Sequence, residues 1–141
     1  MNTNHNESQV KKPIILITED HDVLRTSLRE WVWTNFPNVR VLEATNGEAA
    51  LSLAYAYQPD IILMDIGLPQ MNGLEATRRI KKALPLTKVV ILTIHENPEY
   101  QQDAEAAGAS AYVPKRKMGV QLGKVMTRLL PVSLDTPSVH G

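Results

Sequence analysis

The sequence predicts a doubly wound α/β fold, in which helices cover both faces of a parallel five-stranded sheet. Two observations predict it. Three short runs are almost purely aliphatic and are bounded by turn-forming residues, a pattern typical of strands that are buried on both faces. Segments with an apolar stripe at helical spacing alternate with the strand-like runs, which favours parallel strands joined by helical crossovers.

The strands are expected at five places along the chain. The second mixes polar and apolar residues, as an edge strand does, whereas the first, third and fourth are aliphatic. Right-handed crossovers leave few topologies. Among these we take the flavodoxin-like strand order 2-1-3-4-5 by analogy with that fold, and not from the residues themselves. The predicted strands are residues 13–18, 39–44, 61–65, 88–93 and 109–113.

A helix is expected after each strand. Asn72 is a favourable N-cap for the third helix, and Asn97 followed by Pro98 is a favourable start for the fourth. The fourth helix is rich in Ala and Gln with only Tyr100 as a large apolar anchor, so we expect it to be weakly held and mobile. The core-facing stripe of the first helix is predicted to extend to Asn35. The predicted helices are residues 22–35, 47–57, 73–83, 98–107 and 118–130.

Length and composition favour one globular domain. The chain has 141 residues, of which 43% are hydrophobic, and a domain of this size buries roughly two-thirds of its unfolded surface. We expect a domain at residues 13–130 between disordered tails at residues 1–12 and 131–141. The chain has no Cys and no apolar stretch that could span a bilayer, so a cytoplasmic location without membrane contact is expected. Fifteen basic and fifteen acidic residues cancel, which argues against direct binding of nucleic acid.

Polar side chains stand where the predicted strands end. Glu19 and Asp20 follow the first strand, Asp65 ends the third, Thr93 ends the fourth and Lys115 follows the fifth. Carboxyl ends of parallel strands share one sheet edge, where open α/β sheets keep their ligands. Three carboxylates in one place repel each other unless a cation is present, and Mg²⁺ prefers such hard oxygen ligands. A carboxylate nucleophile, a divalent ion and nearby donors suit phosphoryl transfer, with Asp65 as the candidate nucleophile.

Simpler interpretations of single residues stay open. Glu19 or Asp20 taken alone would be read as a residue that caps a helix, and only their combination with Asp65 and Lys115 points to chemistry. Trp33 lies about half a turn from the apolar stripe of its helix, so it either packs at the helix end or contacts a partner.

Three segments resemble the receiver domain of two-component response regulators, and most closely its NarL/FixJ branch. They run from Met64 to Pro69, from Met71 to Ala76 and from Ala107 to Tyr112, and the resemblance extends from about residue 13 to residue 130. It implies a CheY-like fold. It also implies that Asp65 accepts a phosphoryl group from a phosphohistidine on a sensor histidine kinase.

The resemblance further implies roles for the remaining site residues. Asp20, Asp65 and the backbone carbonyl of Gly67 would bind Mg²⁺, and Glu19 would act through a metal-bound water. Thr93 and Lys115 would contact phosphoryl oxygens, and Tyr112 would move inward when Thr93 shifts towards the phosphate. The expected activity is limited to the chain's own phosphorylation and dephosphorylation.

Two departures from the family pattern bear on these roles. Glu19 replaces the commoner Asp, which lengthens the side chain and is expected to change metal affinity. Gly67 occupies a position that usually holds a larger residue. The phosphoryl group would then be more open to water, and the hypothesis is faster self-dephosphorylation.

Two interpretations stay open for how the chain passes on its signal. The chain is expected to signal by protein contact, with an unidentified output protein and a possible homodimer on phosphorylation. The alternative is the receiver part of a NarL-type transcription regulator whose DNA-binding domain is absent from this chain.

Two other classes of protein share parts of the sequence pattern. An FMN carrier would need a phosphate-binding first loop where the acidic residues stand, and an aspartate-nucleophile phosphatase would need an acid where Gly67 stands.

Overall fold

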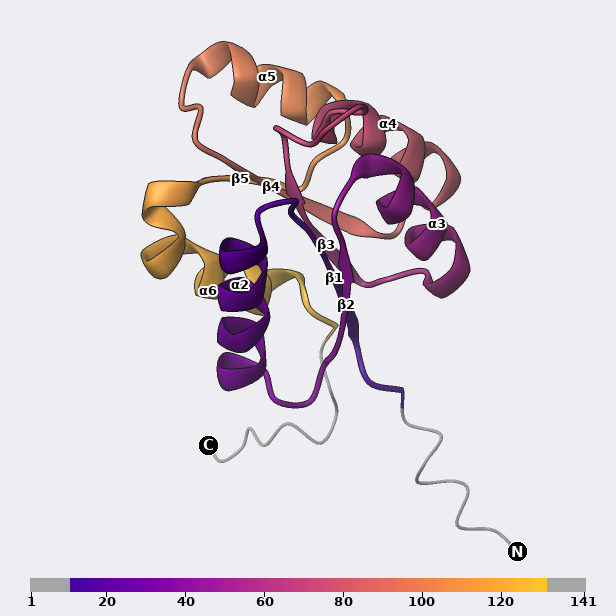
Figure 1. Ribbon diagram of the computed structural model, residues 1–141, viewed down its shortest axis with the longest axis vertical. Helices are drawn as coiled ribbons and strands as arrows, with labels where there is room; N and C mark the ends of the chain where they lie inside the picture. Colours follow the sequence, from indigo (N-terminus) through magenta and orange to yellow (C-terminus); the bar gives the residue numbers. More distant parts are fainter. Residues whose placement is uncertain (1–10, 132–141) are drawn as a thin grey trace, which may run out of the picture.

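The computed structural model describes residues 11–131, so the predicted tails lie outside the described residues except for residues 11, 12 and 131. Strands and helices alternate as predicted (Figure 1). Within the described range no helix has the length and apolar character needed to cross a membrane. The elements are β1 (Ile14–Thr18), α2 (Asp22–Asn35), β2 (Arg40–Ala44), α3 (Gly47–Tyr57), β3 (Ile61–Asp65), α4 (Gly73–Ala83), β4 (Lys88–Thr93), α5 (Pro98–Ala106), β5 (Ala111–Pro114), a 3₁₀ turn (Lys115–Lys117) and α6 (Met118–Leu129).

The five strands form one parallel sheet in the order β2-β1-β3-β4-β5, which confirms the predicted order. In the register between the two central strands, Leu16 lies opposite Ile62 and Thr18 lies opposite Met64. Because both strands run the same way, their carboxyl ends reach the same edge of the sheet. This edge carries the residues of the candidate site.

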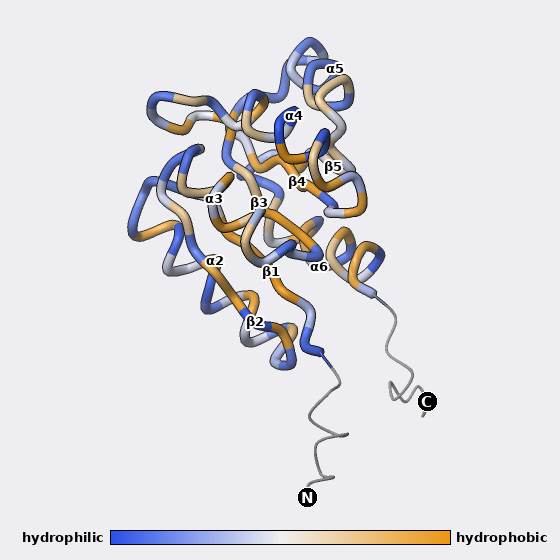
Figure 2. The backbone as a smooth tube through the Cα atoms, turned by 90° about the vertical axis from the view of Figure 1, so that its right-hand side faces the viewer, coloured by the Kyte–Doolittle hydropathy of each residue, from blue (hydrophilic) through white to orange (hydrophobic). Residues whose placement is uncertain are grey.

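Helices cover both faces of the sheet, and this explains why its central strands are aliphatic throughout. Helices α2 and α6 lie on one face, and α3, α4 and α5 lie on the other (Figure 1). Successive side chains of a strand point to opposite faces, so Ile15 and Ile17 pack towards α2 and α6, whereas Leu16 packs towards α3 and α4. The hydrophobic strands run through the middle of the molecule (Figure 2).

At the starts of α3 and α4, an asparagine side chain caps the helix by accepting a hydrogen bond from a backbone N–H group of the first turn. The side-chain oxygen of Asn72 accepts a hydrogen bond from the backbone N–H of Glu75 at 2.9 Å, and Asn46 caps α3 in the same way. Asn97 is also an N-cap, but its side chain makes no capping hydrogen bond. Pro98 therefore marks the start of α5 through its backbone geometry.

Apart from shifts of one residue at the ends of several elements, the structure differs from the sequence-based expectations at three places. The fifth strand begins at Ala111 instead of residue 109, because Gly108 has a left-handed φ of 102° and turns the chain before the strand. Asn35 is exposed and was wrongly assigned to the core face of α2; its amide donates to the carbonyl of Trp31. The 3₁₀ turn before α6 was not predicted.

Two other expectations concern the environment of Trp33 and the packing of α5. Trp33 is 48% exposed, and the Arg29 guanidinium lies 5.7 Å from its ring centroid, so this Trp belongs to the surface of α2 and is available to a partner. Helix α5 contributes one buried residue, Ala104, while Tyr100 is half-buried. The mobility of α5 stays a prediction.

Candidate functional site

The acids at the ends of β1 and β3 come together as predicted. Glu19, Asp20 and Asp65 each offer a carboxylate oxygen, and these oxygens lie within 4.8 Å of one another. Their proximity follows from the parallel pairing of β1 with β3, which brings both strand ends to the same sheet edge. Glu19 and Asp65 are buried, at 2% and 7% exposure, whereas Asp20 is exposed.

Lys115 supplies the positive charge of the cluster. Its ammonium nitrogen Nζ lies 3.1 Å from Oε1 of Glu19 and 3.3 Å from Oδ1 of Asp65. The side chain reaches these acids from the carboxyl end of β5. One ammonium thus partly offsets two buried carboxylates, whose mutual repulsion would otherwise be costly.

The two buried carboxylates are bound differently. Both oxygens of Glu19 have partners, since Oε1 contacts Lys115 and Oε2 accepts a hydrogen bond from the backbone N–H of His21 at 3.1 Å. For Asp65, the Lys115 contact and the backbone N–H of Gly67, at 3.2 Å, both fall on Oδ1. Both oxygens of Glu19 are therefore bound by the protein, whereas Oδ2 of Asp65 has no hydrogen-bond or ion-pair partner among the described residues.

Thr93 and Tyr112 meet at the loop that follows β4. The Thr93 hydroxyl accepts a hydrogen bond from the backbone N–H of His95 at 3.0 Å, and the Tyr112 hydroxyl donates to the carbonyl of the same residue at 2.5 Å. The His95 ring stacks on Tyr100 with centroids 4.4 Å apart. Burial raises the pKa of Tyr112 above its ordinary value, although a hydrogen bond with Thr93 opposes the shift.

Two glycines flank Asp65 in contrasting surroundings. A Cβ on Gly67 would meet no atom within 4 Å, so this position faces open space beside the acid. A Cβ on Gly73 would lie 2.1 Å from the backbone oxygen of Asp65. The backbones of α4 and β3 therefore approach so closely that no side chain fits between them. This role of Gly73 was not predicted, and the pair Asn72-Gly73 after the third strand is the only sign of it in the sequence.

The donor set fits a magnesium ion. Carboxylates from Asp20 and Asp65 are hard oxygen ligands, and Mg²⁺ typically takes one or two carboxylates and keeps several waters. Both oxygens of Glu19 already have protein partners, and its role at the metal stays a prediction. The net negative charge of three acids beside one lysine also favours a cation.

Residues 15–126 match the response regulator receiver domain family. The transcriptional regulatory protein DegU of Brevibacillus brevis is 36% identical over 115 residues, which cover 82% of this chain and 48% of DegU. The nitrate/nitrite response regulator protein NarL of Escherichia coli is 33% identical over 102 residues, which cover 72% of this chain and 47% of NarL. The chain thus spans about half the length of these curated relatives.

The fold agrees with the sequence match. The signal receiver domain of the NarL-type regulator from Mycobacterium tuberculosis superposes with a TM-score of 0.75 at 27% identity, covering 84% of this chain and 95% of that one. In this chain the strand order, the acidic cluster at the sheet edge and the lysine after β5 all lie where they were predicted from the sequence. By sequence and by fold, this chain belongs to the response regulator receiver domains and is similar to those of the NarL type.

Proposed function

We propose that Asp65 accepts a phosphoryl group from a phosphohistidine of a sensor histidine kinase. The observation that carries the proposal is the position of its carboxylate, which is buried at the sheet edge, lies 3.3 Å from Lys115 and shares a cluster with Asp20. In the transfer, an Asp65 oxygen forms a bond to phosphorus while the phosphorus–nitrogen bond of the donor breaks. The bonding electron pair stays on the imidazole nitrogen, which then takes a proton.

The contacts of Asp65 support a choice between its two oxygens. Oδ1 already contacts Lys115 and the N–H of Gly67, which favours Oδ2 as the oxygen that would attack phosphorus. Asp20, Asp65 and the carbonyl of Gly67 would hold Mg²⁺. The ion, when bound, offsets the negative charge of the phosphoryl oxygens. Lys115 is placed to stay with Oδ1 or to pair with a phosphoryl oxygen after transfer.

The response to phosphorylation is a shift between two arrangements of the loop after β4. Thr93 would turn its hydroxyl to a phosphoryl oxygen and release the N–H of His95. Tyr112 would then leave the carbonyl of His95 and move inward. The outward surface of α5, β5 and α6 would change with it, and would contact an output protein or a second copy of the chain.

The chain would act in the cytoplasm and catalyse only its own phosphorylation and dephosphorylation. Regulation of transcription is the second candidate for the output, favoured by the names of the relatives DegU and NarL. DNA contacts would then come from a domain outside this chain. A gel-shift assay of this chain, with and without phosphorylation, tests direct DNA binding, and no shift is expected because its charges balance.

The proposal is tested by phosphotransfer from the sensor kinases of the host organism. Each kinase is autophosphorylated with labelled ATP and mixed with the chain in Mg²⁺. At least one kinase is expected to transfer label within seconds to minutes, and EDTA is expected to stop the transfer. No transfer from any kinase and none from a small phosphoryl donor would refute the proposal.

A further inference from the structure

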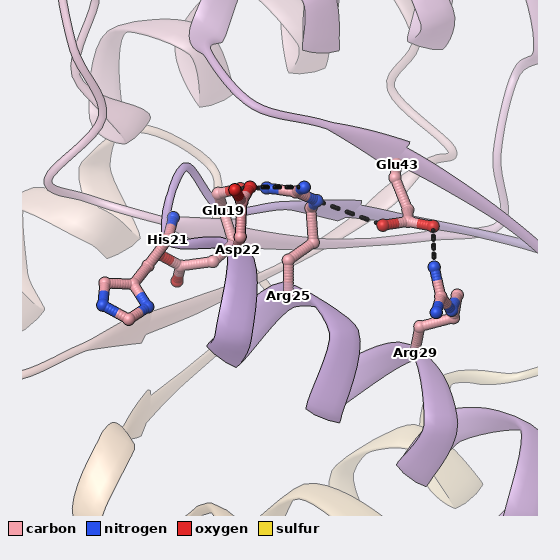
Figure 3. A network of polar contacts seen from close by, with 6 residues as sticks. All are labelled: Glu19, His21, Asp22, Arg25, Arg29 and Glu43. Carbon is pink, nitrogen blue, oxygen red and sulfur yellow. Dashed lines mark hydrogen bonds and ion pairs between the residues drawn. The ribbon is translucent and has the colours of Figure 1, made fainter.

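Arg25 connects helix α2 to strand β2 and to the loop after β1, next to the acidic cluster. Its NH1 donates to the backbone carbonyl of Glu19 at 2.9 Å, its NH2 to Asp22 at 2.7 Å and its Nε to Glu43 at 3.1 Å (Figure 3). Its side chain is only 15% exposed. The hydrogen bond to Asp22 raises the pKa of Arg25, as does the one to Glu43, although burial opposes the shift. The guanidinium is held in one orientation, because its planar group makes three directed contacts.

Glu43 fixes this guanidinium from the edge strand. It lies on β2 and divides its carboxylate between two arginines of α2, with Oε1 bound by Arg25 and Oε2 by NH1 of Arg29 at 2.9 Å (Figure 3). The two arginines are one helical turn apart and share one acid. Only Arg25 also reaches the loop that carries the acidic cluster.

The bond from Arg25 to Glu19 acts on the peptide that leads into Asp20. The Glu19 carbonyl belongs to the Glu19–Asp20 peptide group, which is planar, so holding its oxygen sets the direction in which Asp20 leaves the loop. On the other side, the N–H of Glu19 donates to the carbonyl of Ala44 at 3.0 Å.

Asp20 itself depends on this backbone. Among the described residues, no hydrogen bond or ion pair involves the Asp20 side chain, although it belongs to the cluster whose oxygens lie within 4.8 Å of one another. Its position is therefore set through its main chain. Arg25 is the only side chain in the described part of the molecule that binds the carbonyl before it.

We propose that Arg25, oriented by Glu43, is a positioning residue for the magnesium site, and that it acts by holding the Glu19–Asp20 peptide in the orientation that directs Asp20 towards Asp65. This inference rests on the proposed function, because it assumes that Asp20 and Asp65 bind the ion. Arg25 has no contact with the ion in this scheme. Residues that orient metal ligands typically change metal affinity by 10-fold to 100-fold when they are replaced.

The charge of Arg25 and its positioning role predict opposite changes in Mg²⁺ affinity when Arg25 is replaced, and this makes the inference testable. A positive charge near a cation site opposes the ion, so removing Arg25 would strengthen Mg²⁺ binding if charge were its main effect. If positioning dominates, the same change weakens binding. Arg25→Lys separates the two, since a lysine keeps the charge but cannot make three directed hydrogen bonds.

The experiment is a Mg²⁺ titration followed by the backbone amide NMR signals of Asp20 and Gly67. The dissociation constant is expected to rise about 10-fold for Arg25→Gln and for Arg25→Lys, and about 3-fold for Glu43→Gln. Arg29→Gln is the matched control, because it removes the other ion pair of Glu43 and leaves the Glu19 carbonyl bound. It is expected to stay within about 2-fold of the wild type.

Unchanged or tighter Mg²⁺ binding in both Arg25 variants would overturn the inference while leaving the proposed function intact, provided that the wild type binds the ion. A wild type that does not bind Mg²⁺ would overturn both. Thermal unfolding without Mg²⁺ is measured in parallel, and a fall in Tm with unchanged affinity means a purely structural role and also overturns the inference. If Arg25→Gln does not fold, Arg25→Lys and Glu43→Gln decide.

Discussion

Nζ of Lys115 lies 3.3 Å from Oδ1 of Asp65, although β4 separates their two strands in the sheet. The lysine spans the intervening strand end and also meets Oε1 of Glu19 at 3.1 Å. One side chain thus connects the ends of β1, β3 and β5. The arrangement keeps two buried acids close together before any ligand arrives.

Replacing Lys115 is expected to destabilise the fold and to make it depend on magnesium. Lys115→Met keeps the unbranched apolar stem of the side chain but leaves two buried carboxylates without their cation. The free energy of unfolding at pH 7 should fall by about 2–4 kcal/mol. Mg²⁺ should recover more of the stability in the variant than it adds to the wild type. Urea unfolding with and without Mg²⁺ measures both effects.

Arg79→Met is the control for this variant, because Arg79 forms an exposed ion pair with Glu75 on α4. Exposed pairs contribute little to stability, so this control should lose much less than Lys115→Met. Equal losses in the two variants would contradict the role given to Lys115.

The close approach at Gly73 predicts a strong difference between two glycines. Gly73→Ala would force a methyl group against the Asp65 backbone, and we expect the free energy of unfolding to fall by about 1–3 kcal/mol. Gly67→Ala places its methyl group in open space and should change it by less than about 0.5 kcal/mol. Urea unfolding of both variants checks this, and a Gly73→Ala variant as stable as Gly67→Ala would disprove the packing argument.

The open space at Gly67 also predicts a short lifetime for the phosphorylated form. Gly67→Asn would add a side chain that shields the phosphoryl group from water, and its Cβ would meet no atom within 4 Å. The half-life of the acyl phosphate should lengthen about 3-fold to 10-fold, which corresponds to an increase of about 0.7–1.4 kcal/mol in the barrier to hydrolysis. Decay of the labelled protein after removal of the donor gives the half-life. An unchanged half-life would rule out the shielding hypothesis.

The raised pKa of Tyr112 predicts that the stability of the fold decreases at alkaline pH. Burial raises its pKa in the folded state, so the folded chain holds the phenol proton more tightly than the unfolded chain. This contribution to stability is complete below the ordinary tyrosine pKa of about 10 and is lost as the pH rises through the higher folded-state pKa. The difference between the ultraviolet pH titrations of the wild type and of Tyr112→Phe gives the ionisation of the Tyr112 phenol alone. A midpoint of the difference curve at or below about pH 10 would contradict the prediction.

The strands and the convergence of the acids were predictable because they depend on local pattern and on one topological rule. An aliphatic run that ends in Asp65 indicates a buried strand and its exit, and parallel pairing with the strand before Glu19 brings the two exits together. The cap at Asn72 depends on an equally local pattern. The start of β5 was misplaced, because Ala109 is as apolar as the strand it precedes and only the φ of Gly108 shows the turn.

Other features depend on distances between segments that no local pattern contains. Glu43 reads as an ordinary polar residue of an edge strand until the register of β2 with β1 places it beside α2. Arg25 likewise reads as a surface residue of an amphipathic helix, and its bond to the Glu19 carbonyl appears only in three dimensions. The close packing of Gly73 on Asp65 is of the same kind.

The central claim is that Asp65 is the residue that becomes phosphorylated, and labelling by acetyl phosphate tests it most directly. The wild type, Asp65→Ala and the exposed-site control Asp103→Ala are incubated with acetyl phosphate and Mg²⁺, and intact mass is recorded alongside the circular dichroism spectrum. We predict that the wild type and Asp103→Ala gain the mass of one phosphoryl group, and that Asp65→Ala keeps its fold and gains none. Retained labelling of Asp65→Ala would contradict the account.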